Sequence, residues 1–448
     1  MNFDQIHTLY FVGIGGIGMS ALARYFNGLG KTIYGYDKTE TSLTRKLVEE
    51  GMTIHYEERP EAIPEGIDLV VYTPAVPDSH RELVYFRQHQ YPLKKRAEVL
   101  GIISRNRRCI GVAGTHGKTT TSSLLTHVLR SGGVDCTAFL GGIAQNFGSN
   151  FVAGQSDWVV VEADEYDRSF LHLQPEKAIV LSMDADHLDI YGDVGQIHES
   201  FHQYVEAVVE GGSIVYKHGL PLEVPAKRSS IAFGLGTGAL QANQIRVVNG
   251  YFEFDLTSPF GDIEQIRMSL PGHHNIENAL AAIGIAQQLG VTSQHIKDAL
   301  ASFKGIKRRF ETIYRDEQVV YIDDYAHHPS ELRAAIHAAR TLFPKRKITG
   351  IFQPHLYSRT RDFVDGFAEA LDQLDEAILL DIYPARELPI PGVSSRLIYE
   401  KMKSREKQLM KKEAFPDAMK NIQPDVLLTL GAGDIGTLVE PIKTHLSS

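Results

Sequence analysis

The sequence is short of cysteine, of long apolar runs and of positive charge. It has only Cys109 and Cys136 in 448 residues, which excludes a disulfide framework and favours a reducing compartment. No run of about 18 apolar residues occurs, and no charged segment followed by an apolar stretch opens the chain. We therefore expect no membrane insertion and no signal peptide, and expect a cytoplasmic protein. The formal net charge of -9 argues against a nucleic-acid partner.

Length and composition set the scale of the fold. A chain of 448 residues has room for about three domains of ~150 residues each, and 43% hydrophobic with 23% charged residues is ordinary for a globular protein. Strand and helix patterns alternate, which predicts an α/β fold. We expect a Rossmann-like domain at 1–105, a P-loop ATPase-like domain with a parallel sheet at 106–308, and a Rossmann-like α/β domain at 309–448.

A phosphate-binding loop is predicted between Arg108 and Gly133, where an apolar strand runs into a Gly-rich turn and a helix. The glycines let the backbone approach phosphates, and the helix N-terminus attracts them. The lysine neutralises phosphate charge, and the next threonine hydroxyl suits Mg²⁺. Val112 stands where the general motif has its first glycine, so the spacing departs from that motif. The predicted ATP-binding residues of the loop are Gly114, Thr115, His116, Gly117, Lys118, Thr119 and Thr120.

A second glycine-rich turn follows the first apolar strand, 8–12, and precedes a helix. It fits the G-x-G-x-x-G spacing with Gly13, Gly15, Gly16 and Gly18. Asp37 ends the next strand about twenty residues on, as a dinucleotide fingerprint requires. Alone, this pattern suggests NAD, but such turns also bind other nucleotides or only allow close packing. A later strand, 69–72, leads into Thr73.

Acidic residues follow two apolar strands of the central domain. The strand 158–161 leads into EADE, which begins at Glu162, and the strand 178–183 leads into DADHLD, which contains His187. Mg²⁺ is normally held by a carboxylate at the end of a strand beside the phosphate loop, so Glu162 is a predicted metal ligand. His187 alone would be interpreted as a structural histidine, but its acidic neighbours favour a ligand or a phosphate contact.

The end of the central domain carries weaker signals. Short strands between Gly212 and Gly272, with a hairpin at Asn249-Gly250, predict a small antiparallel subdomain. Asn275 precedes an Ala-rich helix, and its simplest role is to cap that helix. The basic segment 304–310, KGIKRRF, is either a solvated linker or a clamp that places a cation on a nucleotide.

The last domain is predicted to be a second α/β unit. Strands and helices alternate from Gln318 onward, which implies a parallel sheet covered on both faces. Its strands end in polar groups that include Asp324, His327 and His355, and ligands of open α/β sheets bind at such ends. Arg359 follows closely, and its planar guanidinium suits a carboxylate or phosphate.

Several motifs occur in order along the whole chain: GTHGKTTT, EADEYDRSF, DADHLD, HHNIENA, RRFE, DDYAHHPSE and FQPHLYSRTRDF. Together they resemble the Mur ligases of peptidoglycan synthesis. The resemblance implies an ATP-dependent ligase that joins L-alanine to the carboxylate of UDP-N-acetylmuramate through an acyl phosphate. It also implies that the first glycine-rich turn holds UDP and not NAD.

The resemblance assigns roles to the residues of the first two domains. Lys118 and Thr119 would bind ATP phosphate and Mg²⁺, Glu162 a first Mg²⁺ and His187 a second metal ion. The UDP-sugar would be bound by Gly13, Gly15, Gly16, Gly18, Asp37 and Thr73.

The resemblance extends to the segments around the third domain. Asn275 would contact adenine, Arg309 the ATP phosphates and Asp324 the ribose. His327 and Arg359 would position the alanine, and closure of the third domain would keep water from the acyl phosphate.

The chain departs from the family pattern at two positions. Leu356 stands where members commonly have arginine, and Tyr166 where they have serine. Leu356 removes one candidate partner for a carboxylate in the alanine pocket.

Three classes of function remain open at this stage. The first is the ATP-dependent ligase, which within the family is either the alanine ligase or a recycling ligase that attaches a tripeptide. The second is an NAD-dependent oxidoreductase, which leaves the phosphate loop and the acids unexplained. The third is a P-loop switch, which needs no second nucleotide site. The sequence also leaves open whether the protein is a monomer or a homodimer, and whether it prefers alanine, glycine or serine.

Overall fold

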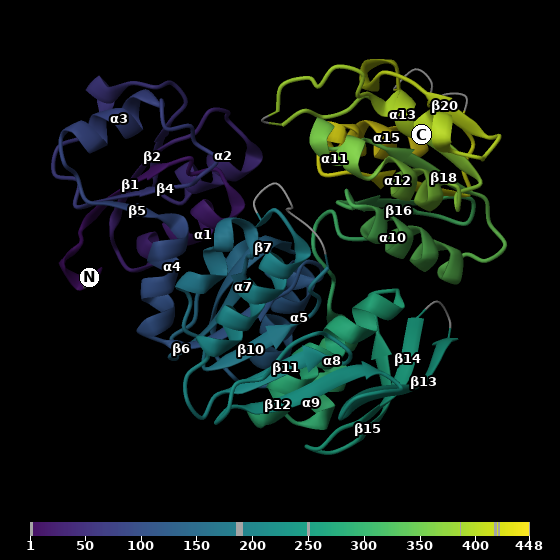
Figure 1. The fold of residues 1–448 in the computed structure, drawn as a ribbon, viewed down its shortest axis with the longest axis horizontal. Coiled ribbons are helices and arrows are strands. Elements are labelled where there is room, and N and C mark those ends of the chain that lie inside the picture. Colours follow the sequence, from purple (N-terminus) through teal and green to yellow (C-terminus); the bar gives the residue numbers. More distant parts are fainter. Residues whose placement is uncertain are drawn as a thin grey trace. The chain divides into compact units, whose positions relative to one another are not determined.

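The computed structural model describes residues 3–184, 191–248, 251–385, 387–415, 419 and 422–447. Three sheets organise this part of the chain (Figure 1). The chain divides into two compact units. The first contains the residues up to Ile245 with Phe254–Arg267 and Glu277–Lys304, and the second contains Arg246–Glu253, Met268–Ile276 and the residues from Gly305 onward.

The first sheet has five parallel strands in the order β3-β2-β1-β4-β5. Its elements are β1 (Thr8–Val12), α1 (Ile17–Gly28), β2 (Thr32–Tyr36), α2 (Ser42–Glu49), β3 (Thr53–His55), β4 (Leu69–Tyr72), α3 (Arg81–Gln88), β5 (Leu93–Lys95) and α4 (Arg96–Arg105). The strand order reverses between β1 and β4. Open α/β sheets bind ligands beyond the carboxyl ends of the strands at such a point, which here lies next to Gly13 and Thr73.

Strand β1 shows why this sheet is buried on both faces. Leu9 and Phe11 pack into a core that contains Leu22 and Phe26 of α1, whereas Tyr10 packs on the other face. Successive side chains of a strand point to opposite faces, so a continuous apolar run suits a parallel sheet covered by helices on both sides.

The second sheet has ten strands in the order β15-β14-β13-β12-β11-β10-β6-β9-β7-β8. The elements around it are β6 (Arg108–Ala113), α5 (Lys118–Ser131), β7 (Thr137–Ala144), β8 (Ser149–Val152), β9 (Trp158–Ala163), η3 (Tyr166–His172), β10 (Lys177–Val180), α7 (Val194–Glu206), β11 (Ser213–Lys217), β12 (Ser229–Leu235), β13 (Leu240–Val248), β14 (Tyr251–Thr257), β15 (Ile263–Met268), α8 (His273–Gln288) and α9 (Ser293–Ser302). Strand β6 pairs in parallel with β9 and β10. The segments that follow these three strands therefore meet at one edge of the sheet.

The strands from β11 to β13 correct one expectation. β11 pairs with β12 in parallel, and β12 pairs with β13 in parallel, so for these strands the expected antiparallel arrangement is wrong. A run of short strands in a sequence shows where strands lie but not which way their partners run. The hairpin expected at Asn249-Gly250 lies outside the described residues.

The first two sheets share one core within the first unit. That core contains Phe26 and Leu100 from around the first sheet together with Val159 and Phe170 from around the second. The buried Asn150 side chain donates to the Ile17 carbonyl at 2.6 Å and to the Ser20 hydroxyl at 2.9 Å, and it accepts from Arg24. Apolar packing and hydrogen bonds therefore join the two sheets.

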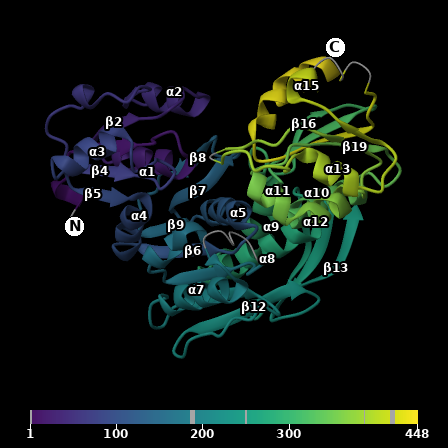
Figure 2. The same cartoon turned by 45° about the horizontal axis from the view of Figure 1, so that its top comes forward.

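The third sheet lies in the second unit and has the order β16-β17-β21-β18-β19-β20. Its elements are β16 (Glu311–Arg315), β17 (Val320–Asp324), α10 (Pro329–Leu342), β18 (Ile348–Phe352), α11 (Tyr357–Asp362), α12 (Val364–Leu371), β19 (Glu376–Leu379), α13 (Ser395–Lys401), β20 (Lys407–Leu409), β21 (Val426–Leu430) and α15 (Val439–Leu446). Only β16 pairs antiparallel among the pairs of this sheet in the described residues. One face packs against α10, α12 and α13 and the other against α15, as Figure 2 shows. The predicted parallel sheet with two covered faces is confirmed.

Cys109 and Cys136 are both buried and free. In the part of the chain that the structure describes, no helix combines the length and the apolar character needed to cross a bilayer.

Candidate active site

The phosphate loop connects β6 to α5 through two glycines with positive φ. Gly114 has φ 145° and Gly117 has φ 84°. A Cβ on Gly117 would lie 2.6 Å from Oδ1 of Asn278, so a larger residue would force a shift there. The backbone hydrogen bonds of α5 begin at Thr121, whose N–H donates to the Gly117 carbonyl at 2.9 Å. The N–H groups of the three residues before it have no partner inside the helix, as an anion site requires.

Ser182, which follows β10, holds the other residues of the loop. Its hydroxyl accepts from the His116 N–H at 2.9 Å and lies 2.9 Å from the Thr115 hydroxyl. The Thr115 hydroxyl also accepts from the Asp184 N–H at 3.1 Å. Thr120 is half-buried in the first turn of α5. The segment after β10 therefore fixes the shape of the loop.

Lys118 is held by a carboxylate and a carbonyl. Its Nζ donates to the two carboxylate oxygens of Glu165 at 2.7 and 3.0 Å and to the Gly114 carbonyl at 2.8 Å. The side chain of Lys118 is 14% exposed and that of Glu165 is 1% exposed. Burial alone would lower the pKa of Lys118, but the surrounding carboxylates, first Glu165 and then Asp164 and Glu162, hold it above its usual value. Burial raises the pKa of the Glu165 carboxyl.

Thr119 and Glu162 present two oxygens that fit a magnesium ion. The Thr119 hydroxyl donates to Oε1 of Glu162 at 3.0 Å, and Oε2 of Glu162 accepts from the Gly141 N–H at 2.8 Å. Two neighbouring ligands of an octahedral Mg²⁺ with bonds of about 2.1 Å lie about 3 Å apart, so the spacing suits this ion. Burial raises the pKa of Glu162, and the positive charge of Lys118 opposes this shift. The other predicted metal ligand, His187, lies outside the described residues.

The glycine-rich turn after β1 is closed by Asp37. The N–H groups of Gly13 and Ile14 donate to the Tyr36 carbonyl, and the Gly15 N–H donates to the Asp37 carboxylate at 2.7 Å. A Cβ on Gly13 would lie 3.0 Å from the methyl group of Thr73, which follows β4. Asp37 thus supports the turn with one carboxylate oxygen, a role that the spacing alone did not predict.

A cavity of about 300 Å³ lies within the first unit and is bordered by the glycine-rich turn at the start of α1. The first sheet contributes residues from the start of α1 and from the end of β4, and the second contributes the ends of β7 and β9. The wall includes Gly16, Gly18, Thr73, Gly141, Glu162 and Asp164. The structure therefore brings the predicted UDP-sugar residues Gly16, Gly18 and Thr73 to the same cavity as the predicted metal ligand.

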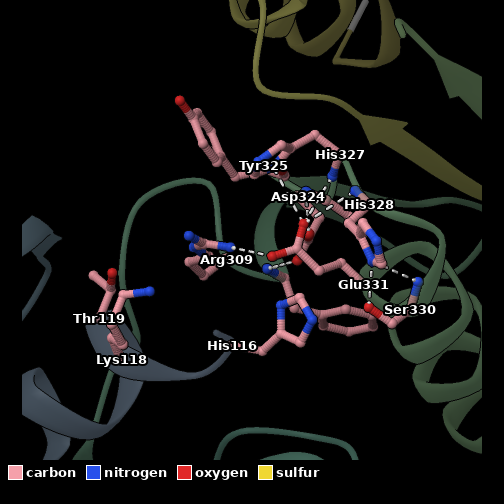
Figure 3. Close-up of polar contacts among 12 residues, drawn as sticks. His116, Lys118, Thr119, Arg309, Asp324, Tyr325, His327, His328, Ser330 and Glu331 are labelled. Carbon is pink, nitrogen blue, oxygen red and sulfur yellow. Dashed lines mark hydrogen bonds and ion pairs between the residues drawn. The ribbon is translucent and has the colours of Figure 1, made fainter. Parts of the chain in front are cut away.

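A second group of predicted residues surrounds Glu331 at the start of α10 (Figure 3). The Glu331 carboxylate lies 3.7 Å from Nη1 of Arg309, accepts from the His327 N–H at 2.9 Å and lies 3.2 Å from Nδ1 of His327. The Asp324 carboxylate accepts from the N–H groups of Phe310 at 2.6 Å and Ala326 at 2.7 Å. Arg309, Asp324 and His327 therefore lie together at the carboxyl end of β17.

Burial also affects this second group. It raises the pKa of Asp324 to about 6, although the charge of Arg309 opposes the shift. The Arg309 guanidinium lies over the Tyr325 ring, 5.2 Å from its centroid. The Tyr325 ring, the Arg309 cation and the Asp324 carboxylate together present groups that can stack on a base, pair with phosphate and accept a hydrogen bond from a ribose hydroxyl.

The remaining predicted residues lie on other elements. Asn275 is in the first turn of α8, where its amide donates to the Pro271 carbonyl at 2.7 Å, so it is inside the helix and not its N-cap. Arg359 lies in α11 and is 9% exposed. Leu356 precedes α11 with φ 69°, and Tyr166 begins η3, where its N–H donates to Asp164 at 3.2 Å.

Sequence reasoning missed three contacts of this site. It did not predict that Glu165 pairs with Lys118, that Arg96 borders the cavity, or that Glu331 joins Arg309 and His327. The position of Glu165 in EADE was the one available signal. Nothing in the local pattern around Arg96 points to a site, because its neighbours Gly18 and Asp164 lie far from it in the sequence.

Comparison with known proteins places this geometry in a family. Family models match along the chain: the Mur ligase family catalytic domain at residues 8–108, the Mur ligase middle domain at 112–286 and the Mur ligase glutamate ligase domain at 308–433. A UDP-N-acetylmuramate-L-alanine ligase of Flavobacterium psychrophilum is 49% identical over 455 residues, covering 100% of this chain and 99% of that protein. The solved UDP-N-acetylmuramate-alanine ligase of Thermotoga maritima matches with a TM-score of 0.84 at 29% identity, over 98% of this chain and 99% of the other. A murein peptide ligase of Psychrobacter arcticus shares the fold, with a TM-score of 0.72 at 23% identity over 99% of both chains. The resemblance seen in the motifs is confirmed, and the chain belongs to the Mur ligase family.

Proposed function

We propose that this chain is an ATP-dependent amide ligase that joins L-alanine to the carboxylate of UDP-N-acetylmuramate and forms ADP and phosphate. The observation that carries this proposal is the cavity that a second glycine-rich turn shares with the acids beside the phosphate loop. Such a cavity suits a nucleotide-linked substrate, because the nucleotide can bind at the glycine-rich turn while the carboxylate at the other end of the substrate reaches ATP. The identity of the two joined molecules follows from the names of the full-length relatives, such as that of Flavobacterium psychrophilum.

The reaction divides into two steps. A carboxylate oxygen of the sugar nucleotide attacks the γ-phosphorus of ATP, ADP leaves, and an acyl phosphate forms. The amine of alanine then attacks the acyl carbon, phosphate leaves, and the amine loses a proton as the amide forms.

The first step uses the phosphate loop. The free N–H groups at the start of α5 bind the ATP phosphates, and Lys118 exchanges Glu165 for a phosphate oxygen and offsets the charge of the transferring group. Thr119 and Glu162 would hold a Mg²⁺ ion, and His187 would hold a second one. When bound, Mg²⁺ supplies positive charge that lowers the cost of bringing two anions together.

The other site residues bind and position the substrates. The glycine-rich turn with Asp37 and Thr73 binds the UDP part of the sugar nucleotide. Asn275, Arg309 and Asp324 contact ATP, and His327 and Arg359 position the alanine. We assign these roles to domains at 1–105, 106–308 and 309–448.

Phosphate release from ATP with UDP-N-acetylmuramate tests the proposal. Reactions with L-alanine, glycine, L-serine or the tripeptide are compared with a reaction that contains no amine. We expect release that depends on L-alanine, with a product heavier by one alanine residue. Release only with the tripeptide would assign the recycling reaction instead, and no release with any amine would refute the ligase.

A further inference from the structure

Arg96 contributes a cationic side chain to the wall of the cavity in the first unit. It is the first residue of α4 and also borders a smaller hollow beside η3. Its surroundings show that it is built to hold an anion.

The guanidinium of Arg96 is largely buried yet poorly satisfied. Its side chain is 20% exposed, and Nη2 lies 3.7 Å from the Asp164 carboxylate. Within the described ranges it donates no hydrogen bond, although a guanidinium carries five N–H donors. None of the guanidinium nitrogens is fully buried, so these donors are accessible to solvent and open to a ligand with acceptor oxygens that enters the cavity.

The position of Arg96 next to α1 shows what kind of ligand this is. A Cβ on Gly18 would lie 2.8 Å from Nη1 and 2.9 Å from Cδ of Arg96, so the arginine lies against the first turn of α1. The first bond of this helix runs from the Ser20 N–H to the Gly16 carbonyl, so the N–H groups of Ile17, Gly18 and Met19 have no partner inside the helix. A cation beside the positive end of a helix is unfavourable unless an anion lies between them.

We infer that Arg96 binds the diphosphate of the sugar nucleotide together with the N-terminus of α1, and that Asp164 holds the guanidinium while no substrate is bound. This inference rests on the proposed function, which supplies the sugar nucleotide. A planar guanidinium matches phosphate oxygens in a bidentate manner. The substrate carboxylate is the other anion available, but the free N–H groups of α1 adjoin Arg96 and favour the diphosphate.

The test measures binding of UDP, UDP-N-acetylglucosamine and UDP-N-acetylmuramate by calorimetry to the wild-type chain and to Arg96→Ala, Arg96→Lys and Arg105→Ala. Arg105 is the matched control, because it is an exposed arginine at the other end of α4 that borders neither cavity. We expect the Kd of all three ligands to rise about 10- to 100-fold in Arg96→Ala, in line with the loss of hydrogen bonds to a charged group. Arg96→Lys should recover part of this loss, and Arg105→Ala should bind as the wild type does. ADP binding should be unchanged in every variant.

A second variant moves Arg96 without removing its charge. Gly18→Ala places a methyl group against the guanidinium, and alanine suits a helix better than glycine, so the fold should be retained. We expect weaker binding of the same three ligands.

The outcomes separate this inference from the proposed function. Unchanged UDP binding in Arg96→Ala would overturn the inference, and a loss confined to UDP-N-acetylmuramate would assign Arg96 to the carboxylate and overturn the diphosphate contact. If the wild-type chain binds all three ligands but releases no phosphate with L-alanine, the proposed function fails while the binding result still decides the role of Arg96.

Discussion

At the residue scale, the pair formed by Lys118 and Glu165 links stability to catalysis. Lys118→Met removes the cation and leaves the Glu165 carboxylate buried without its partner. Breaking a buried pair in this way costs about 3–5 kcal/mol. Because burial raises the pKa of Glu165, the folded variant favours the protonated acid, so its stability falls as pH rises. We expect turnover to fall about a hundredfold or more, while UDP binding survives. Urea unfolding at pH 5.5 and 8, phosphate release and calorimetry measure these effects.

The double variant Lys118→Met with Glu165→Gln is the control for this prediction. It should regain much of the stability at pH 8 but none of the turnover, because the unpaired carboxylate is gone and the lysine is still missing. A double variant no more stable than the single one would contradict the role of the ion pair. Loss of UDP binding in the single variant would point to misfolding.

Thr119 allows a test of the proposed magnesium site. Thr119→Val keeps the shape of the side chain but removes the hydroxyl that lies 3.0 Å from Glu162. We expect phosphate release to fall about 10- to 100-fold and to need more Mg²⁺ for half-maximal rate, because one oxygen ligand is lost. Thr119→Ser keeps the hydroxyl and should stay close to the wild type. Phosphate release by both variants is measured over a range of Mg²⁺ concentrations. An equal loss of activity in the two variants would argue against Thr119 as a metal ligand.

The raised pKa of Asp324 predicts that the stability of the second unit depends on pH. Burial raises the pKa of its carboxyl from 3.8 to about 6, so the protonated form is favoured in the folded state. The stabilisation is present below about pH 4 and is lost as pH rises through 6, with a slope of at most about 1.4 kcal/mol per pH unit. Asp324→Asn cannot ionise and should show a flatter curve of unfolding free energy between pH 4 and 7. Parallel curves for the two proteins would show that Asp324 does not titrate in this range.

At the scale of the element, the glycines at the two ends of α5 allow the cost of backbone strain to be measured apart from the cost of a steric clash. Gly117 before the helix and Gly133 after it have φ 84° and φ 80°, but a Cβ would meet Asn278 at 2.6 Å only at Gly117 and has open space at Gly133. Gly133→Ala should therefore cost only the strain of a positive φ, about 1 kcal/mol. Gly117→Ala should cost more and should weaken ADP binding. Denaturant unfolding and ADP titration test this, and equal effects in both variants would contradict it.

The elements predicted best are those with an uninterrupted apolar run between polar ends. The strands at 8–12 and 69–72 have the predicted bounds, because burial on both faces leaves an apolar pattern that can be recognised without knowing the partner strand. The direction of β11 to β13 was missed, since the strand pattern is the same for parallel and antiparallel partners. The start of α8 was placed after Asn275, although the helix begins at His273.

The residues of the candidate site also fall into a group that the sequence predicts and a group that it does not. Gly114, Gly117, Lys118, Thr119 and Glu162 were predicted because each follows a strand or opens a helix in a pattern that local chemistry explains. The partners that complete the site come from elsewhere in the chain, and apart from the place of Glu165 in EADE they leave no local trace. Arg96 meets Asp164 only because α4 and the end of β9 pack together in the first unit.

At the scale of the whole molecule, the sheet of the first domain has one core of its own and a second core that it shares with the second sheet. Helices α1 and α4 carry Phe26 and Leu100 into the core that also contains Val159 and Phe170. Asn150 ties the start of α1 to β8 through its buried amide. A domain that shares a core with a neighbour exposes apolar surface when it is isolated, and a fragment of about 100 residues has little stability to spare.

This shared core predicts how fragments of the chain behave. Residues 1–105 alone should lack a cooperative unfolding transition, because the apolar faces of α1 and α4 become exposed to water. Each Å² of apolar surface exposed in this way lowers the free energy of unfolding by roughly 25 cal/mol. Residues 1–304 keep both sheets and should unfold in one transition and bind UDP, but they lack His327 and Arg359 and should not make the amide. Circular dichroism with urea, UDP titration and phosphate release with L-alanine measure the three properties. If residues 1–105 unfold cooperatively and bind UDP as tightly as 1–304 do, then the two sheets are independent, and the contacts of Asn150 join them without stabilising either.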